Sequence, residues 1–159
     1  MSIRTVRVIG DDLLRKKSKP VEEITPRIKA LIEDLYETMY EEDGVGLAAP
    51  QIGILRRIFV VDTTMNEKNP ERYVMINPEI LETSGTQEGS EGCLSVPGKH
   101  AKVIRPRCVK VKALDEEGRE FVVEAEDLLA RAILHEFDHL EGVLYVDKAS
   151  GPIEDNEED

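Results

Sequence analysis

The chain has 159 residues, of which 40% are hydrophobic and 34% charged, so it fits one folded domain and excludes both a disordered protein and a disulfide-built small scaffold. Its 21 basic and 33 acidic residues give a net charge of −12, which argues against stable binding to nucleic acid or to an anionic membrane. With two cysteines and no apolar run long enough for a signal peptide or a membrane span, we expect a cytoplasmic protein.

The first predicted element is an amphipathic helix from about Pro26 to Tyr40. Thr25 and Pro26 form an N-cap followed by proline in the first turn, and Asp43-Gly44 ends the helix. Its apolar positions have helical spacing: Ile28, Leu31, Ile32, Leu35 and Met39. The next segment, Gly44 to Gln51, is too rich in glycine and alanine for a strand and too apolar for a solvated loop. We therefore expect backbone packed closely against another part of the molecule.

The chain from there to about Ala125 has the pattern of β-strands. Ile58 to Val61 and Tyr73 to Ile76 are short β-branched runs, and the alternation from Cys108 to Ala113 leads through a turn to Phe121 to Val123, which predicts an antiparallel hairpin. A second helix follows, which carries Leu128, Leu129, Ala132, Ile133 and Leu140 and ends near Gly142. The predicted fold is α+β: mainly antiparallel sheets packed around this second helix, with an N-terminal amphipathic helix.

The second helix carries the sharpest local motif, His135-Glu136-Phe137-Asp138-His139. The two histidines are four residues apart, so both imidazoles project from one face and can bind one metal ion, with Glu136 within reach of a bound water. The alternative to a metal site is a pair of histidines that are exposed to solvent or hydrogen-bonded on the helix. Leu128 and Ala132 lie on the same face, however, so the histidines extend an apolar stripe where unpaired imidazoles are costly. The motif therefore indicates a metal site.

A third ligand is needed. No histidine follows His139 in the chain. Tyr145 occupies the position at which one class of zinc protease has its third histidine ligand. Upstream, Glu91-Gly92-Cys93-Leu94-Ser95 presents a thiol in a turn-rich stretch. A lone cysteine is usually an inert apolar residue, and Cys108 fits that description.

Three segments together resemble the peptide deformylase family: Gly44-Val45-Gly46-Leu47-Ala48-Ala49-Pro50-Gln51, Glu91 to Ser95, and His135 to His139. They stand in the family's order, and the similarity extends from about Arg4 to Ala149. The resemblance implies a metal-dependent hydrolase that removes the N-formyl group from the N-terminal formylmethionine of newly synthesised polypeptides and releases formate. It also implies a single catalytic domain over residues 1–150, followed by an acidic, disordered tail over residues 151–159.

A site of Cys93, His135 and His139 would leave a fourth position for water, as in catalytic metal sites. Metal-bound hydroxide would attack the formyl carbon, with Glu136 as general base and then general acid. By resemblance, the Gln51 amide and the Leu94 backbone N–H stabilise the charge on the carbonyl oxygen. Without the motif, Gln51 would be read as a solvent-facing residue.

The resemblance places the substrate backbone beside Gly44 to Gly46 and Gly92, with the methionine side chain near Val45, Leu128 and Ala132. Those three could equally be ordinary core residues. Glu91, Arg105 and Asp138 are expected to form a charge cluster that orients the ligands, with surface salt bridges as the alternative.

The expected cofactor is one divalent metal ion per chain. A thiolate and two imidazoles suit several ions; the resemblance favours Fe²⁺, with Zn²⁺, Ni²⁺ and Co²⁺ as alternatives. The expected partners are N-formylmethionyl nascent peptides, with transient proximity to the ribosome, and we expect a monomer. Two residues depart from the family pattern: His100 replaces an arginine found in some members, and Leu134 replaces a common glutamine.

Two other readings remain open on sequence alone. One is a different His-Glu-x-x-His hydrolase such as a metallopeptidase, in which Cys93 would have no role. The other is a relative that binds formylated N-termini without cleaving them, which is disfavoured because binding alone does not require Glu136.

Overall fold

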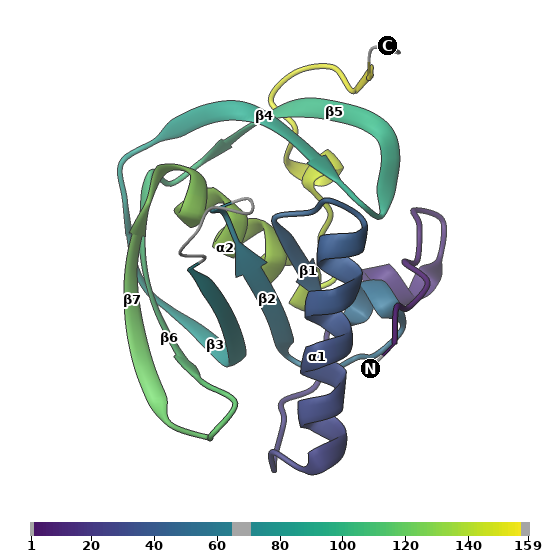
Figure 1. The fold of residues 1–159 in the computed structure, drawn as a ribbon. Helices are drawn as coiled ribbons and strands as arrows, with labels where there is room; N and C mark the ends of the chain where they lie inside the picture. The colour runs from purple at the N-terminus through teal and green to yellow at the C-terminus, as the bar shows by residue number, and fades with distance from the viewer. Residues whose placement is uncertain (1, 65–70, 157–159) are drawn as a thin grey trace.

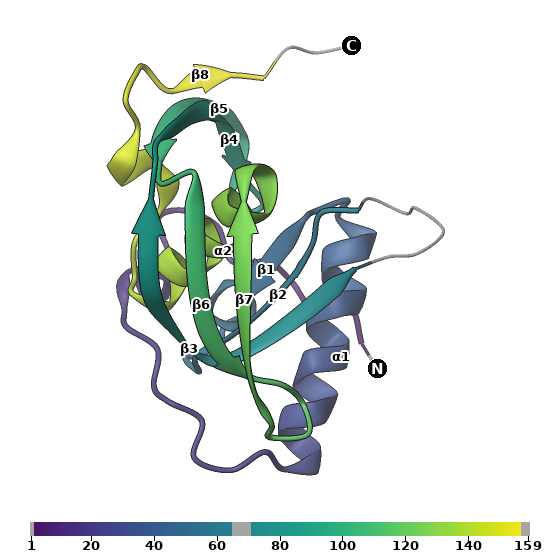
Figure 2. The ribbon, with the colours of Figure 1, turned by 90° about the vertical axis from the view of Figure 1, so that its left-hand side faces the viewer.

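A computed structural model describes residues 2–64 and 71–156 of the chain. A five-stranded antiparallel sheet with the order β1-β2-β3-β6-β7 and a three-stranded sheet with the order β4-β5-β8 make up the β-structure (Figures 1 and 2). The helices and strands are α1 (Pro26–Glu41), β1 (Gly46–Ala48), β2 (Ile58–Asp62), β3 (Arg72–Ser84), β4 (Gln87–Cys93), β5 (Val96–Arg105), β6 (Cys108–Leu114), β7 (Glu120–Glu126), α2 (Asp127–Leu140) and β8 (Glu154–Asp155). The predicted α+β class is confirmed. Short 3-10 helices cover Asp12–Arg15, Ala49–Ile52 and Tyr145–Lys148.

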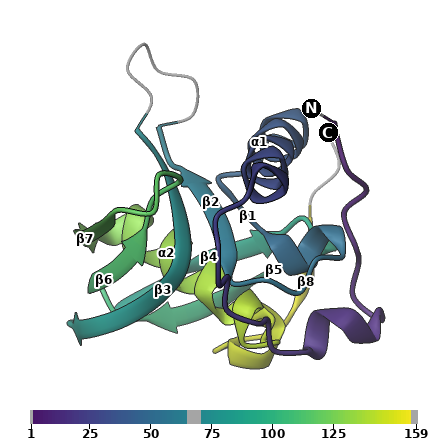
Figure 3. The ribbon, with the colours of Figure 1, turned by 90° about the horizontal axis from the view of Figure 1, so that it is seen from below.

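The five-stranded sheet lies between the two helices, as the view from below shows (Figure 3). Strand β2 is buried on both faces because its side chains alternate between two cores. Ile58 and Val60 pack in the core that includes α1, whereas Phe59 and Val61 pack in the core that includes α2. This arrangement fixes α2 against the sheet. The β4–β5 hairpin lies above α2 in Figure 1 and contacts the 3-10 helix at Tyr145–Lys148.

The predicted boundaries of the first helix hold to within one residue, and the second helix ends two residues before Gly142. Helix α1 begins after Thr25, whose side chain accepts a hydrogen bond from the Ile28 N–H at 3.2 Å. Helix α2 ends before Gly142, which has a positive φ of 76° and lies so close to Arg15 that a Cβ would be 2.4 Å from its carbonyl oxygen. The hairpin of β6 and β7 is antiparallel, as predicted.

Three details differ from the sequence-based expectation. Gly46–Ala48, judged unsuited to a strand, forms β1 and pairs with β2, because a strand of small residues can lie directly against α2. Strand β3 does not end at Ile76 but continues past Pro78 by means of an irregularity in its pairing with β6. The β4–β5 hairpin was not recognised as such because its strands are polar on their exposed face.

The acidic tail was expected to be disordered from residue 151 onward. Its Glu154–Asp155 segment instead forms β8, which pairs with Lys99 and His100 on the edge of β5 (Figure 2). The Asp155 carboxylate forms an ion pair with Lys99, and Asn156 Oδ1 accepts a hydrogen bond from His100 Nδ1 at 2.7 Å. Residues 157–159 lie outside the described part of the chain. Among the described residues, no helix is both long and apolar enough to cross a bilayer.

The N-cap of α1 gives a test of local stability. Replacing Thr25 by alanine removes the acceptor for the Ile28 N–H, so we expect the free energy of unfolding to fall by about 1 kcal/mol. Urea denaturation of Thr25→Ala measures it. The control is Thr86→Ala, an exposed threonine between β3 and β4, for which a change within about 0.5 kcal/mol is expected. Equal effects of the two substitutions would show that the cap contributes nothing.

Candidate metal centre

Cys93, His135 and His139 come together in the structure, as the sequence predicted. Their potential ligand atoms all lie within 4.8 Å of one another, and Cys93 Sγ is 3.4 Å from His139 Nε2. Both histidines are buried on α2, whose opposite side packs in the core through residues such as Ile133 and Leu140. Cys93 is the last residue of β4, where the hairpin turns. Two separate elements therefore supply the three side chains.

This donor set fits a catalytic metal ion. A thiolate and two imidazoles are ligands for zinc and ferrous iron, and an ion held by three protein ligands would keep a coordination position for water or substrate. Burial lowers the pKa of His139 well below its usual value, and Arg105 acts in the same direction. His139 is thus held neutral, which is the form of imidazole that binds metals.

Glu91 connects this cluster to the rest of the site. Its Oε1 accepts a hydrogen bond from His135 Nδ1 at 2.8 Å and another from Arg105 Nη2 at 2.9 Å, while Arg105 Nη1 donates to Asp138 Oδ2 at 2.9 Å. Burial by itself would raise the pKa of Glu91, but hydrogen bonds from His135 and Arg105 outweigh it and lower that pKa to about 2. The expected cluster of Glu91, Arg105 and Asp138 is present and buried, which distinguishes it from surface salt bridges.

Sequence reasoning missed Arg131, which joins the same cluster. Its Nη1 donates to Glu91 Oε2 at 2.5 Å, and its side chain is only 10% exposed. The signal was available: Arg131 lies one turn before His135, between Ala130 and Ala132, in the buried part of an amphipathic helix. A charged residue at such a position requires a partner.

Glu136 has the opposite surroundings from Glu91. Its carboxyl group is buried, and its Oε1 has no hydrogen-bond partner within residues 2–64 and 71–156. Burial raises the pKa of Glu136 to about 7 against the opposing effect of His135. The side chain lies against β1, where a Cβ on Gly46 would be 2.5 Å from Glu136 Oε2. The lack of a side chain at residue 46 is therefore what makes space for Glu136.

Gln51 is buried rather than solvent-facing. Its Oε1 accepts from the Ala48 N–H at 3.0 Å, and its Nε2 donates to Ser95 Oγ at 3.0 Å and lies 3.6 Å from Cys93 Sγ. These contacts fix the side-chain amide beside the cysteine. Ser95, whose role was not predicted, is fully buried and orients it.

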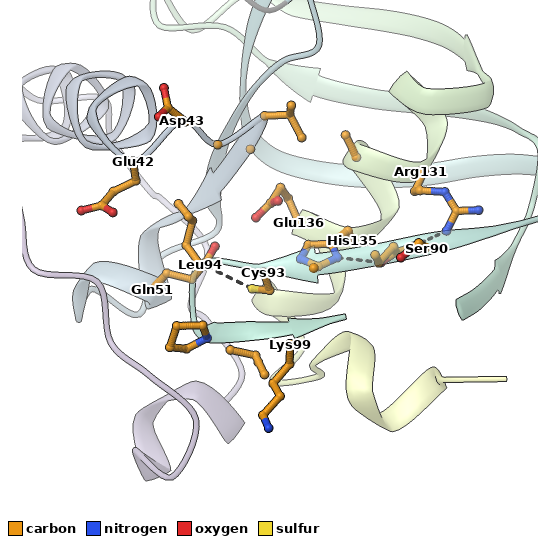
Figure 4. A pocket seen from close by; sticks show the side chains of 18 of the residues that line it. Glu42, Asp43, Gln51, Ser90, Cys93, Leu94, Lys99, Arg131, His135 and Glu136 are labelled. Carbon is orange, nitrogen blue, oxygen red and sulfur yellow. Dashed lines mark hydrogen bonds and ion pairs between the residues drawn. The ribbon is translucent and has the colours of Figure 1, made fainter. Parts of the chain in front are cut away.

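A cavity of about 520 Å³ opens beside the cluster, with Cys93, His135 and Glu136 facing it (Figure 4). Every residue predicted to contact the substrate lines this cavity: Gly44, Val45, Gly46, Gly92, Leu128 and Ala132. Leu94, Gln51 and Arg131 line it as well. Leu128 is 50% exposed and so belongs to the surface at the cavity rather than to the core, whereas Ala132 is buried.

A pair of histidines on a helix, a cysteine from a neighbouring hairpin and a buried glutamate beside a cavity define a metal-dependent hydrolase. Comparison with known proteins gives its family. The family model for polypeptide deformylase matches residues 3–154 of the chain. The chain therefore belongs to the polypeptide deformylase family, and its activity is removal of the N-formyl group from nascent peptides.

Individual relatives and solved structures support the same family assignment. Peptide deformylase 1 of Clostridium acetobutylicum is 60% identical over 148 residues, which cover 93% of this chain and 95% of the relative. A solved peptide deformylase from Legionella pneumophila superposes with a TM-score of 0.90 at 46% identity, covering 94% of this chain and 87% of that one. The deformylase of Synechococcus elongatus, solved in complex with actinonin, gives a TM-score of 0.86 at 41% identity, with coverage of 92% and 78%.

The contact between Gly46 and Glu136 leads to a prediction. In Gly46→Ala the new Cβ would overlap the Glu136 carboxyl group, so we expect kcat to fall by about 10-fold or more because the glutamate is displaced from its position. Kinetics of formate release and metal analysis of the same preparation measure the effect. Metal content should stay near that of the wild type.

Gly151→Ala is the matched control, because no heavy atom of the described residues lies within 4 Å of a Cβ at that position. Its kcat should equal that of the wild type. Wild-type kcat in Gly46→Ala would contradict the steric argument.

Proposed function

We propose that deformylation takes place in the cavity beside Cys93, His135 and His139, and that these three residues hold one divalent metal ion, with Fe²⁺ favoured over Zn²⁺, Ni²⁺ and Co²⁺. The observation that carries the proposal is the convergence of the three ligand atoms within 4.8 Å of one another, directly beside Glu136. When bound, such an ion lowers the pKa of water and polarises a carbonyl oxygen. The preference for iron rests on the family resemblance.

Glu136 is proposed as the group that moves the proton. Its pKa is about 7, and none of the described residues forms a hydrogen bond with Oε1. The carboxylate can therefore accept a proton from the attacking water and then donate it to the departing methionine amine. A pKa near neutrality suits both steps because neither protonation state is strongly preferred. The close contact with Gly46 holds the carboxyl group at the cavity wall.

Gln51 and Leu94 are proposed to stabilise the negative charge that develops on the formyl oxygen. The side-chain amide of Gln51 is held in place by Ala48 and Ser95, so it need not reorganise during the reaction. The backbone N–H of Leu94 would be the second donor. Leu94 adjoins Cys93, which places this donor next to the metal ligands.

The cavity lining supports a substrate orientation. An extended peptide would pair its backbone with Gly44 to Gly46 on one side and Gly92 on the other, where side chains are absent or small. The methionine side chain would lie among Val45, Leu128 and Ala132. Glu91, Arg105 and Asp138 are proposed to orient the metal ligands without touching the substrate.

We further propose that the protein acts as a monomer in the cytoplasm and meets its formylated substrates on or near the ribosome. The chemistry of the substrate supports this location, since formylated N-termini are those of newly made chains. Residues 1–150 are proposed to form the whole catalytic domain, with β8 as an appended segment.

A first test separates this proposal from a metallopeptidase that would not use the cysteine. Cys93→Ala should lose the bound metal and release no formate from formyl-Met-Ala-Ser, because it removes one of three protein ligands. The protein is purified without oxygen, its metal is identified by elemental analysis, and formate is assayed. Cys108→Ala, the other free cysteine, is the control and should retain both metal and activity. A Cys93→Ala protein with full metal and activity would refute the ligand assignment.

Glu136→Gln tests the proton transfer. The variant should keep its metal but lose about 10²- to 10⁴-fold in kcat, because glutamine fills the same space and cannot exchange a proton. The alternative of a binding protein without catalysis predicts no formate release even from the wild type. Loss of the metal in Glu136→Gln would instead show that Glu136 supports the ligands.

A further inference from the structure

The metal ligands come from two elements that are far apart in the sequence. Cys93 ends β4, whereas His135 and His139 lie on α2. The three ligand atoms can converge only if α2 is held at a fixed position relative to the β4–β5 hairpin. The buried contacts between these elements are mainly polar and involve Glu91, Arg105, Arg131 and Asp138.

Within this group, Arg131 bonds to both strands of the β4–β5 hairpin. Its Nη1 lies 2.5 Å from Glu91 Oε2, 3.2 Å from the carbonyl oxygen of Val103 and 3.4 Å from that of Gly89. One guanidinium of α2 thus reaches both strands of the hairpin. The backbone carbonyls are fixed acceptors, so these bonds define a position as well as neutralising a charge.

Arg131 also adds a second buried positive charge to the cluster. Arg105 is shared between two buried carboxylates, Glu91 and Asp138, and a single positive charge cannot neutralise both. Lys148 contacts Asp138 from the exposed side, whereas Arg131 provides the second buried cation at Glu91. Glu91 in turn accepts from His135 Nδ1, which leaves His135 Nε2 free for the metal.

Gly89 makes space for this guanidinium. A Cβ at residue 89 would lie 3.0 Å from Arg131 Nη2 and 3.3 Å from its Cζ, closer than ordinary van der Waals contact. Arg131 also lines the cavity (Figure 4), as do Leu128 and Ala132 on the same helix. A small residue on β4 and a large cationic one on α2 therefore fit together at this wall.

We propose that Arg131 is a positioning residue for the metal centre: through Glu91 it holds the His135 ring in the orientation that binds metal, and through Val103 and Gly89 it fixes α2 against the hairpin that carries Cys93. This inference rests on the proposed metal site. Arg131 touches neither the reacting atoms nor the ion, so its effect on the reaction is indirect.

The test uses Arg131→Met, which keeps a side chain of similar length at the cavity wall but removes every hydrogen bond. The probe is Zn²⁺ alone, whose affinity is measured by competition with a chelator. We expect the dissociation constant for Zn²⁺ to rise about 10- to 100-fold, as for other groups that orient metal ligands. In the metal-loaded enzyme, kcat for formyl-Met-Ala-Ser should fall while KM stays within about 2-fold, because methionine still covers the wall.

Three further variants make the result specific. Arg107→Met, the matched control, removes an exposed arginine that pairs with Glu126 and Asp127 and should leave the affinity for Zn²⁺ unchanged. Arg131→Lys should restore part of the affinity, because it returns the positive charge without the fork that reaches both strands. Gly89→Ala should weaken Zn²⁺ binding by displacing the guanidinium while all charges are kept.

The outcomes separate this inference from the metal site itself. If Cys93→Ala does not weaken Zn²⁺ binding, the proposed site is wrong. If Cys93→Ala does weaken it but Arg131→Met binds Zn²⁺ as the wild type does, the site stands and the role of Arg131 is refuted. If Arg131→Met fails to fold, Gly89→Ala decides: wild-type affinity in that variant refutes the role, and a raised dissociation constant supports it.

Discussion

The carboxylate of Glu91 is the group on which the geometry of the site depends. It accepts hydrogen bonds from Arg105 on β5 and from Arg131 and His135 on α2, and it lies two residues before Cys93 on β4. A buried carboxylate is costly unless its lone pairs are all engaged, so the three elements can approach one another only in the arrangement that satisfies it. The requirement to pair this one charge thereby fixes the relative positions of the cysteine and the two histidines.

The fold was predictable wherever a periodic apolar pattern coincided with local signals. Helix α1 combined the N-cap of Thr25 with helical spacing, and the β6–β7 hairpin combined alternation with a turn, so both were placed correctly. The sequence did not predict strand β1, because its glycine and alanine are explained by close packing against α2, which no local pattern reveals. The order of Glu154 and Asp155 was not predicted for a similar reason. Their charges alone suggest a solvated tail, and their pairing with the edge of β5 and with Lys99 depends on tertiary structure.

The residues of the site that belong to local sequence motifs were predictable. The spacing of His135 and His139 put both imidazoles on one helix face, and the family resemblance supplied Cys93, Gln51 and Glu91. Arg131 belongs to no motif quoted from the sequence, and its function depends on Glu91 and on two backbone carbonyls of β4 and β5. Side chains that act on other side chains are defined by tertiary contacts, which explains why sequence reasoning found the three proposed ligands and missed Arg131.

Glu91 and Glu136 show how one site gives opposite properties to two identical side chains. Both are buried, yet hydrogen bonds from His135 and Arg105 lower the pKa of Glu91 to about 2. Burial raises the pKa of Glu136, whose Oε1 has no hydrogen-bond partner among the described residues, to about 7. The difference follows from position on the two elements: Glu91 faces the cationic side chains between α2 and the hairpin, and Glu136 faces Gly46 on β1, which offers space but no donor. A carboxylate that must stay charged suits a role in orienting ligands, and one that titrates near neutrality suits proton transfer. The residue type is the same, so the environment built by β1, β4, β5 and α2 sets the pKa of each glutamate and with it the role proposed for each.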